Sequence, residues 1–303
     1  MARLLFARGA SGEIVRKIQR ALMFAPKDVD GVYGKDTEKA LTRFQTANSL
    51  DATGTMDVST WTKLMLTPVP PVRERSLQLT GAFEGHGFTL AQGNFDGAGI
   101  TWGIIGFTLI GGELGKFFKE INQENPALIA QAFQGSAKQL MDVFRAPKAT
   151  QLAFADSVSL GASKGKLAEP WRSAFQRFGE MAEVQAHQLE LADRDYFQPA
   201  LQTAREFGLQ TELGISLCFD VHVQNGSINA KARAAIKQEL QDHPIANEQE
   251  LRVIIANSVA DNARAFQEDV RSRKLTIATG TGSVHGQTFV LRNWGLDESA
   301  FSA

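Results

Sequence analysis

Two carboxylic side chains, Glu84 and Asp96, lie close together in a stretch that is otherwise apolar or rich in glycine. Hydrolysis of a glycosidic bond requires such a pair, with one carboxyl group protonated and the other ionised. Glu84 follows Ala82 and Phe83, and an apolar setting raises the pKa of a carboxyl group and keeps it protonated. Asp96 begins a loop with glycines at 97 and 99, where a carboxylate near water stays ionised. The pair is therefore compatible with glycoside hydrolysis, in which Glu84 would be the general acid and Asp96 the base.

Thr101 follows the same glycine-rich loop, and its hydroxyl group could orient the attacking water. Each of the three residues also has an ordinary structural explanation. A Glu near a helix end is usually solvated, an Asp before Gly usually forms a turn, and Thr favours strands. Only the three residues taken together, with the pattern of residues around them, favour roles in catalysis.

The surrounding patterns predict the elements that position these residues. Leu79 to Phe83 fits the end of a buried helix, and the loosely alternating segment 88–95, bounded by glycines, predicts a β-hairpin. A tail at 276–293 also alternates. Helical periodicity follows the hairpin at about 113–122, 126–143, 171–207, 209–223, 230–241 and 247–272. These elements predict an α+β domain with one dominant helix.

Three prolines at positions 68, 70 and 71 interrupt the chain before this region. Proline removes backbone donors and favours extended backbone in the preceding residue, so the stretch predicts a short, stiff linker. We therefore expect a first domain at 1–66, a linker at 67–75 and a second domain at 76–303. The two domains are expected to fold independently.

The first domain has the periodicity of three short helices. One apolar face contains Ile14, Val15, Ile18, Ala21 and Leu22; a second contains Thr37, Ala40, Leu41 and Phe44; Asp57 begins a third helix with Trp61 and Leu64. The predicted fold class is mainly α: a small three-helix bundle, followed by an α+β domain with a β-hairpin.

A long ordered pattern runs through this first domain. It consists of Val15, Ile18, Gln19, Leu22, Asp30-Gly31-Val32-Tyr33-Gly34, Thr37, Ala40, Leu41, Phe44, Gln45, Leu50, Gly54, Asp57, Thr60, Trp61 and Leu64. The set resembles the peptidoglycan-binding domain of many cell-wall hydrolases. The resemblance implies binding to murein in a shallow groove, for which we name Tyr33 and Arg43 as ligand contacts.

Two stretches of the second domain carry another resemblance. They are Leu79-Thr80-Gly81-Ala82-Phe83-Glu84 with Asn94-Phe95-Asp96-Gly97-Ala98-Gly99-Ile100-Thr101-Trp102-Gly103-Ile104-Ile105-Gly106-Phe107-Thr108, and the segments 193–200, 208–214 and 219–226. Together they resemble the chitosanase-like branch of the lysozyme superfamily, and more loosely phage lysozymes. The resemblance implies a lysozyme-like fold and hydrolysis with inversion.

The same resemblance implies a supporting network behind the acid. In that family an Asp on the helix after the long one joins Arg residues there, and the matching positions are Asp220 and Arg264. An acidic residue between Phe219 and Val221 would itself need a buried partner. Glu113 matches an acidic position after the glycine-rich turn, so we expect it to contact substrate. The chain departs from the family at Ala98, where an Arg is usual, and in a shorter Glu-to-Asp spacing.

Bulk composition excludes several other functions. The net charge of −1 gives no electrostatic reason to expect nucleic acid as a partner. The single cysteine, Cys218, lies in an apolar run and is expected in the core. The five histidines show no paired metal spacing, so we expect no metal and no cofactor. We expect neither a signal peptide nor a membrane span.

The prediction is a monomeric, peptidoglycan-degrading muramidase of the phage endolysin type. It would be made in the host cytoplasm and released to the wall or periplasm by a separate membrane-permeabilising protein. A chitosanase and a wall-degrading secreted effector remain alternatives, as does a lytic transglycosylase. A non-enzymatic wall-binding protein is disfavoured because Glu84, Asp96 and Thr101 are all present.

Overall fold

The computed structural model describes residues 3–85 and 87–301, and the chain forms two compact units. The first unit contains Met1–Glu84 together with Asp193–Ala303, and the second contains Gly85–Ala192. The second junction coincides with a π-helical turn, η3 (Asp193–Phe197). The expected linker at 67–75 lies inside the first unit, so the N-terminal helices share that unit with the C-terminal ones.

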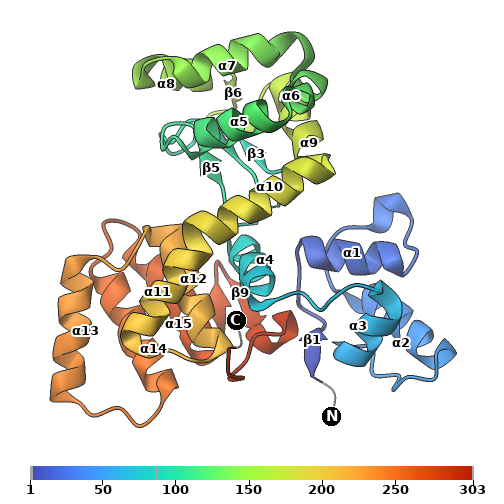
Figure 1. Cartoon of the computed structure of the whole chain (residues 1–303), viewed down its shortest axis with the longest axis vertical. Coiled ribbons are helices and arrows are strands. Elements are labelled where there is room, and N and C mark those ends of the chain that lie inside the picture. The colour runs from blue at the N-terminus through green and yellow to red at the C-terminus, as the bar shows by residue number, and fades with distance from the viewer. Residues whose placement is uncertain (1–2, 86, 302–303) are drawn as a thin grey trace. The chain divides into compact units, whose positions relative to one another are not determined.

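The three helices expected in the N-terminal segment are present (Figure 1). Asp57 caps the third by accepting a hydrogen bond from the Thr60 amide at 2.7 Å. The elements of this segment are β1 (Leu4–Phe6), α1 (Glu13–Ala21), η1 (Pro26–Asp28), α2 (Lys35–Ala47), β2 (Met56–Asp57) and α3 (Val58–Met65). Strands β1 and β2 pair antiparallel.

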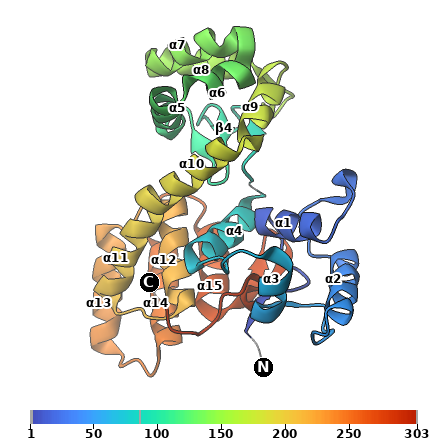
Figure 2. The ribbon, with the colours of Figure 1, turned by 45° about the vertical axis from the view of Figure 1, so that its right-hand side comes forward.

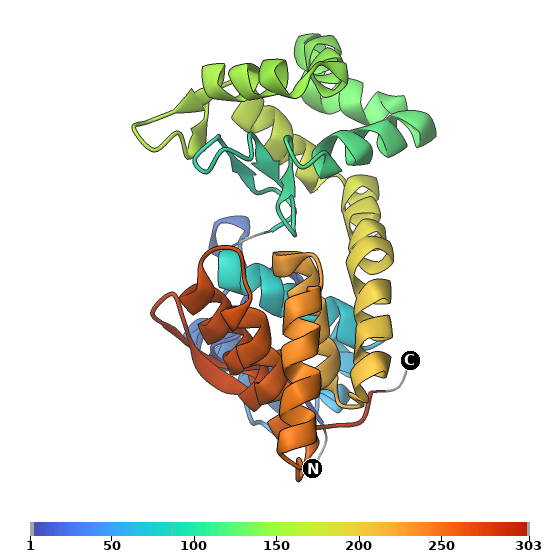
Figure 3. The ribbon, with the colours of Figure 1, turned by 90° about the vertical axis from the view of Figure 1, so that its left-hand side faces the viewer.

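The rest of the first unit is a bundle of helices with a C-terminal hairpin (Figure 3). Its elements are α4 (Val72–Glu84), α11 (Gln198–Phe207), α12 (Glu212–Asn225), α13 (Ala230–Asp242), α14 (Glu248–Asp261), α15 (Gln267–Thr279), β8 (Thr281–Val284), β9 (Gln287–Val290) and η4 (Leu291–Trp294). Every residue of α12 from Glu212 to His222 is buried. A helix that is buried on all sides belongs in the middle of a core, and α12 packs against α4, α11, α14 and α15.

The N-terminal segment is bonded directly to this bundle. The Ala7 amide donates to the Asn293 carbonyl at 3.1 Å, and the Glu13 amide donates to Gln78 Oε1 at 2.6 Å. Arg3 and Arg75 both pair with the buried Glu212. Because a buried carboxylate is stable only with its partners in place, the segment contributes to the stability of the bundle. Independent folding of the two domains stays a prediction, which these contacts make testable.

The second unit surrounds a small antiparallel sheet with helices. Its strands are β3 (Ala91–Gln92), β4 (Thr101–Trp102), β5 (Phe107–Thr108), β6 (Ser159–Leu160) and β7 (Lys166–Leu167), in the order β5-β4-β3-β7-β6. Its helices are α5 (Glu113–Glu124), α6 (Pro126–Phe133), η2 (Gln134–Ser136), α7 (Ala137–Arg145), α8 (Lys148–Ser157), α9 (Trp171–Glu180) and α10 (Ala182–Ala192). The hairpin predicted at 88–95 is in fact the strand β3, paired with β4 and β7.

Trp102 on β4 is the centre of the core of this unit. Its ring lies 5.2 Å from the Phe117 ring and 5.4 Å from the Phe178 ring, and its Nε1 donates to the Phe175 carbonyl at 2.9 Å. Figure 2 shows α5, α6 and α9 grouped around β4. The aromatic contacts fix the strand that carries Thr101.

Three predicted helical segments are broken in the structure. Segment 126–143 divides at η2, and 171–207 breaks only at Met181, between α9 and a continuous helical stretch made of α10, η3 and α11. Segment 247–272 ends as α14 at Asp261 and resumes as α15 at Gln267, with a loop between. No helix within residues 3–85 and 87–301 is long and apolar enough to cross a membrane.

Candidate active site

Glu84 is the last residue of α4, and Gly85, with a φ of 67°, ends the helix. The Glu84 side chain is 25% exposed, so its carboxyl group can reach solvent. Its Oε1 accepts a charge-assisted hydrogen bond from Arg273 Nη1. The expected apolar surrounding is therefore wrong for the carboxyl group itself, which has a guanidinium as its neighbour.

Arg273 belongs to a buried ionic network that extends behind Glu84. Its Nη2 and Nε donate to Asp220 Oδ1 at 2.8 and 2.9 Å. Lys274, the next residue of α15, pairs with Asp220 Oδ2 at 2.5 Å. Asp220 and Lys274 are fully buried, and Arg273 is nearly so. Such a network fixes the position of the guanidinium that holds Glu84.

The charged groups in this network shift one another's pKa values. Burial acts to raise the pKa of Asp220, but attraction to Arg273 and Lys274 outweighs it and lowers that pKa to about 2. Burial lowers the pKa of Lys274 to about 8, although Asp220 opposes the shift. Asp220 is thus ionised at neutral pH.

Further bonds connect the network to neighbouring elements. Thr80 Oγ1, one turn before Glu84, donates to Asp220 Oδ1 at 2.9 Å. Lys274 donates to Gln224 Oε1 at 2.6 Å. The His285 ring, at the turn between β8 and β9, lies 3.0 Å from the Phe83 carbonyl. Bonds on several sides therefore hold the end of α4.

The sequence analysis predicted Asp220 and Arg264 as the supporting network. In the structure, only Asp220 belongs to that network. Arg264 is exposed in the loop between α14 and α15, not on a helix, and has no bond to Asp220. Arg273 occupies the position that was expected for Arg264. The chain leaves the helix at 262–266, and the next helix, α15, carries Arg273 and packs against α12. Arg273 and Lys274 are the members of this network that the sequence analysis missed.

Asp96 lies in the second unit, on the loop between β3 and β4, and is exposed. Its Oδ1 accepts a hydrogen bond from the Ala98 amide at 3.0 Å, as in an Asx turn. Gly97 and Gly99 have φ values of 86° and 80°, so the loop needs glycine at both positions. The sequence-based interpretation of these glycines is therefore correct for the backbone.

Asn94 holds this loop from inside, and the sequence analysis missed it. Its side chain is buried, with Oδ1 accepting from the Gly99 amide at 2.9 Å and Nδ2 donating to Asp156 at 2.7 Å. Its own amide donates to Ser159 Oγ at 2.9 Å. These bonds pin both ends of the loop, so Asp96 is held on a rigid turn.

Thr108 connects Thr101 with Glu113. Thr101 is buried on β4 and is paired across the sheet with Thr108 on β5. Thr108 Oγ1 donates to Glu113 Oε2 at 2.8 Å. Glu113 begins α5, where a carboxylate is favoured by the helix dipole. This bond gives Glu113 a structural reason for its position.

The two predicted ligand contacts of the N-terminal segment have different environments. Tyr33 is fully buried and donates to the Gly54 carbonyl at 2.9 Å, which makes it a core residue. Arg43 is exposed on α2. A hollow of about 630 Å³ lies elsewhere in the segment, bordered by Lys27, Asp30 and Lys35. It is a better candidate for a groove than the surroundings of Tyr33.

The two glutamines of the N-terminal pattern are buried and support loops. Gln19 accepts from the Gly31 amide at 2.8 Å and donates to Asp30, while Gln45 accepts from the Gly54 amide at 2.8 Å. Each glutamine thus fixes a glycine turn. Across the residues that the structure describes, no cluster of His, Cys, Asp or Glu could hold a metal ion; His86 lies outside them.

Two family models match the sequence. One, described as a peptidoglycan binding domain, matches residues 11–64. The other, described as glycosyl hydrolase family 46, matches residues 85–250, which is more than half of the chain. No curated protein matches the sequence.

Solved chitosanase structures have a similar fold. The native chitosanase from Bacillus subtilis MY002 is 17% identical, with a TM-score of 0.53, covering 72% of this chain and 97% of that one. A point mutant of that enzyme complexed with 6 GlcN is 19% identical, with a TM-score of 0.51, covering 73% and 98%. Another chitosanase complex is 21% identical, with a TM-score of 0.51, covering 72% and 95%. At these identities the similarity demonstrates the fold alone.

Proposed function

We propose that this chain, which belongs to glycosyl hydrolase family 46, cuts the glycan strand of bacterial peptidoglycan. The chain is a glycoside hydrolase with an N-terminal peptidoglycan-binding domain. The observation that carries the substrate assignment is this combination in one chain. The N-terminal segment is also bonded to the bundle that holds Glu84, so a wall ligand bound there would be held on the same compact unit as Glu84.

Glu84 is proposed as the general acid that protonates the leaving oxygen. Its carboxyl group is partly exposed, and Arg273 fixes its position. Arg273 is proposed as a positioning residue, because its contacts to Asp220 leave its guanidinium little freedom. A proton donor held in one orientation contributes typically about 10²–10⁴-fold to the rate.

Asp96 is proposed as the base that activates a water molecule, with Thr101 orienting that water. The exposed carboxylate on its rigid loop supports this role, because it is accessible to water and held by Asn94. Attack by such a water inverts the anomeric configuration, and the geometry requires carboxyl groups about 6.5–9.5 Å apart in the working enzyme.

Chitosanase activity is the second candidate function, because the similar solved structures are chitosanases. The two functions separate when the enzyme is given purified murein and chitosan in parallel and the products are analysed by mass spectrometry. Murein fragments with a free reducing end support the proposal. Products from chitosan alone would overturn it, and a 1,6-anhydro ring would indicate a lytic transglycosylase, in which Asp96 has no base role.

The biological setting is proposed to be that of an endolysin. Such an enzyme accumulates in the host cytoplasm and reaches the wall after a separate protein permeabilises the membrane. A secreted wall-degrading effector is the alternative. Expression in the cytoplasm with and without a membrane-permeabilising protein tests this: lysis only in the presence of that protein supports the endolysin.

A further inference from the structure

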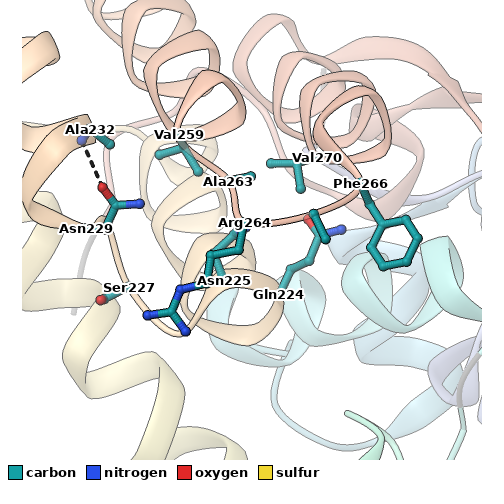
Figure 4. A pocket seen from close by; sticks show the side chains of 11 residues that line it. Gln224, Asn225, Ser227, Asn229, Ala232, Val259, Ala263, Arg264, Phe266 and Val270 are labelled. Atoms are coloured by element: carbon teal, nitrogen blue, oxygen red, sulfur yellow. Dashed lines mark hydrogen bonds between the residues drawn. The ribbon is translucent and has the colours of Figure 1, made fainter. Parts of the chain in front are cut away.

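A cavity of about 350 Å³ opens in the first unit, near the ends of α12 and α14 and the start of α15 (Figure 4). It is formed by the end of α12, the start of α13 and the loop between α14 and α15. Arg264 is its single charged lining residue within the described part of the chain. The cavity is therefore positively charged at one point and otherwise amide-rich and apolar.

Two polar groups in this cavity have no partner among the residues that the structure describes. Asn225 Oδ1 is buried and accepts no hydrogen bond. Arg264 is exposed and forms no ion pair. In contrast, the neighbouring Asn229 caps α13 and also donates to the Asn262 carbonyl. A buried acceptor left without a donor is costly in a folded protein, so a ligand that supplies a donor would be favoured.

Phe266 is the second unusual feature of the cavity. Its side chain is 82% exposed, and its φ is 54°, a conformation that costs energy for a residue with a side chain. Figure 4 shows Phe266 and Arg264 extending from the same loop in opposite directions, with Gln224 between them. The strained backbone of Phe266 and its exposed ring do not stabilise the fold, so their presence at one residue points to a function.

The cavity adjoins the ionic network behind Glu84. Gln224 lines the cavity, and its Oε1 accepts the hydrogen bond from Lys274. Its Nε2 donates to Asp269, whose other carboxylate oxygen is bonded to His285. A sugar in the cavity would thus lie against the same framework that holds the proposed general acid.

We propose that this cavity binds an N-acetylated sugar carrying a carboxylate, the muramic acid type of unit in a glycan strand. This proposal rests on the proposed function and names the sugar that one part of the site recognises. Arg264 would pair with the carboxylate, and Asn225 Oδ1 would accept from the acetamide N–H or a hydroxyl group. The Phe266 ring would cover an apolar face of the glycan. A glucosamine ammonium group would instead face the like charge of Arg264.

The test compares two variants with matched controls on three soluble probes. The variants are Arg264→Ala and Phe266→Gly; the controls are Arg205→Ala, which removes an exposed cation on α11, and Leu66→Gly. Leu66 is 83% exposed with a φ of 54°, so its replacement relieves the same strain outside the cavity. The probes are peptide-free glycan strands, which keep the lactyl carboxylate, and hexamers of N-acetylglucosamine and of glucosamine.

We expect Arg264→Ala to raise KM for the glycan strands roughly tenfold, the loss expected for a charge-assisted hydrogen bond. KM for the glucosamine hexamer should stay level or fall. Phe266→Gly should also raise KM for the strands while its Tm stays level or rises, because glycine suits that backbone. The two controls should match the wild type in KM.

Wild-type KM for the strands in both variants, or an equal rise in the controls, would overturn the proposal for the cavity. Failure of the wild type to cut the strands at all would instead contradict the proposed function. The two failures are therefore distinguishable in the same experiment.

Discussion

Arg273 contacts Glu84 and Asp220 at once, with Nη1 directed to the first and Nη2, at 2.8 Å, to the second. One guanidinium thereby joins the end of α4 to the middle of α12. Its five donors in a fixed plane allow this, whereas the ammonium group of a lysine is a single point on a flexible stem. The partly exposed carboxyl group of Glu84 is oriented by a residue that is itself almost fully buried.

Replacing Arg273 by lysine should therefore lower kcat much more than it raises KM. The charge is kept, but a lysine lacks the planar fork of donors that reaches both carboxylates in fixed directions, and a small misplacement of a reacting group costs roughly 100-fold. Initial rates on soluble glycan strands measure the effect, with a thermal melt beside them. Arg271→Lys is the control, since Arg271 lies on the same helix in a partly exposed pair with Asp261. Equal kcat values for the two variants would show that Arg273 does not position Glu84.

Asp220 should make the stability of the first unit depend on acid. Its folded pKa of about 2 lies below its ordinary value of 3.8, so its contribution to the free energy of unfolding is present above that ordinary value and is lost as pH falls through about 2. A shift of this size is worth about 2 kcal/mol. Urea unfolding between pH 7 and pH 2 measures the loss.

Asp220→Asn should flatten that acid profile and cost about 3–5 kcal/mol at pH 7, because Arg273 and Lys274 lose their buried counter-charge. The control is Asp261→Asn, whose side chain is 63% exposed and whose pair with Arg271 should contribute little. An acid profile that is the same in Asp220→Asn as in the wild type would assign the acid sensitivity to other carboxyl groups.

Local patterns were sufficient to predict α1, α2 and α3, the glycine loop of Asp96 and a buried partner for Asp220. The identity of that partner was not predictable. Segment 262–266 contains neither proline nor glycine, so nothing in its sequence marks the break between α14 and α15. The break decides that Arg273, and not Arg264, faces Asp220.

Two further differences also arise from tertiary structure. Strands β6 and β7 have two residues each, which is too short for any alternation to be recognised. By residue type, Tyr33 fits a ligand contact as well as a core residue, and its full burial and its bond to the Gly54 carbonyl distinguish the two. The proline-rich segment is not helical, as its sequence predicts. The Trp61 side chain, on α3, donates to the Thr67 carbonyl and fixes the start of the segment against that helix.

Removing residues 1–66 should destabilise what remains. The truncation takes away Arg3 and exposes Gln78 and Trp294, which are bonded to the N-terminal segment. A calorimetric comparison of the full chain with the 67–303 fragment should show a Tm lower by roughly 10 °C. An unchanged Tm would support the expectation of two independent domains.

Asp96→Asn should remove most of the activity if Asp96 activates the water. Asp96→Glu should not restore it fully, because one more methylene displaces the carboxylate from its place on a rigid loop. NMR of the first-formed anomer should show inversion. A retained anomer, or full activity in Asp96→Asn, would transfer the role to another carboxylate, of which Glu113 is the first to test.

The most direct measurement is the initial rate at which reducing ends are released from purified murein by the wild type and by Glu84→Gln. The substitution keeps the shape of the side chain and removes its proton, so the melting curve should change little. The account predicts a rate lower by about 10²–10⁴-fold for Glu84→Gln. A Glu84→Gln rate close to that of the wild type would contradict it.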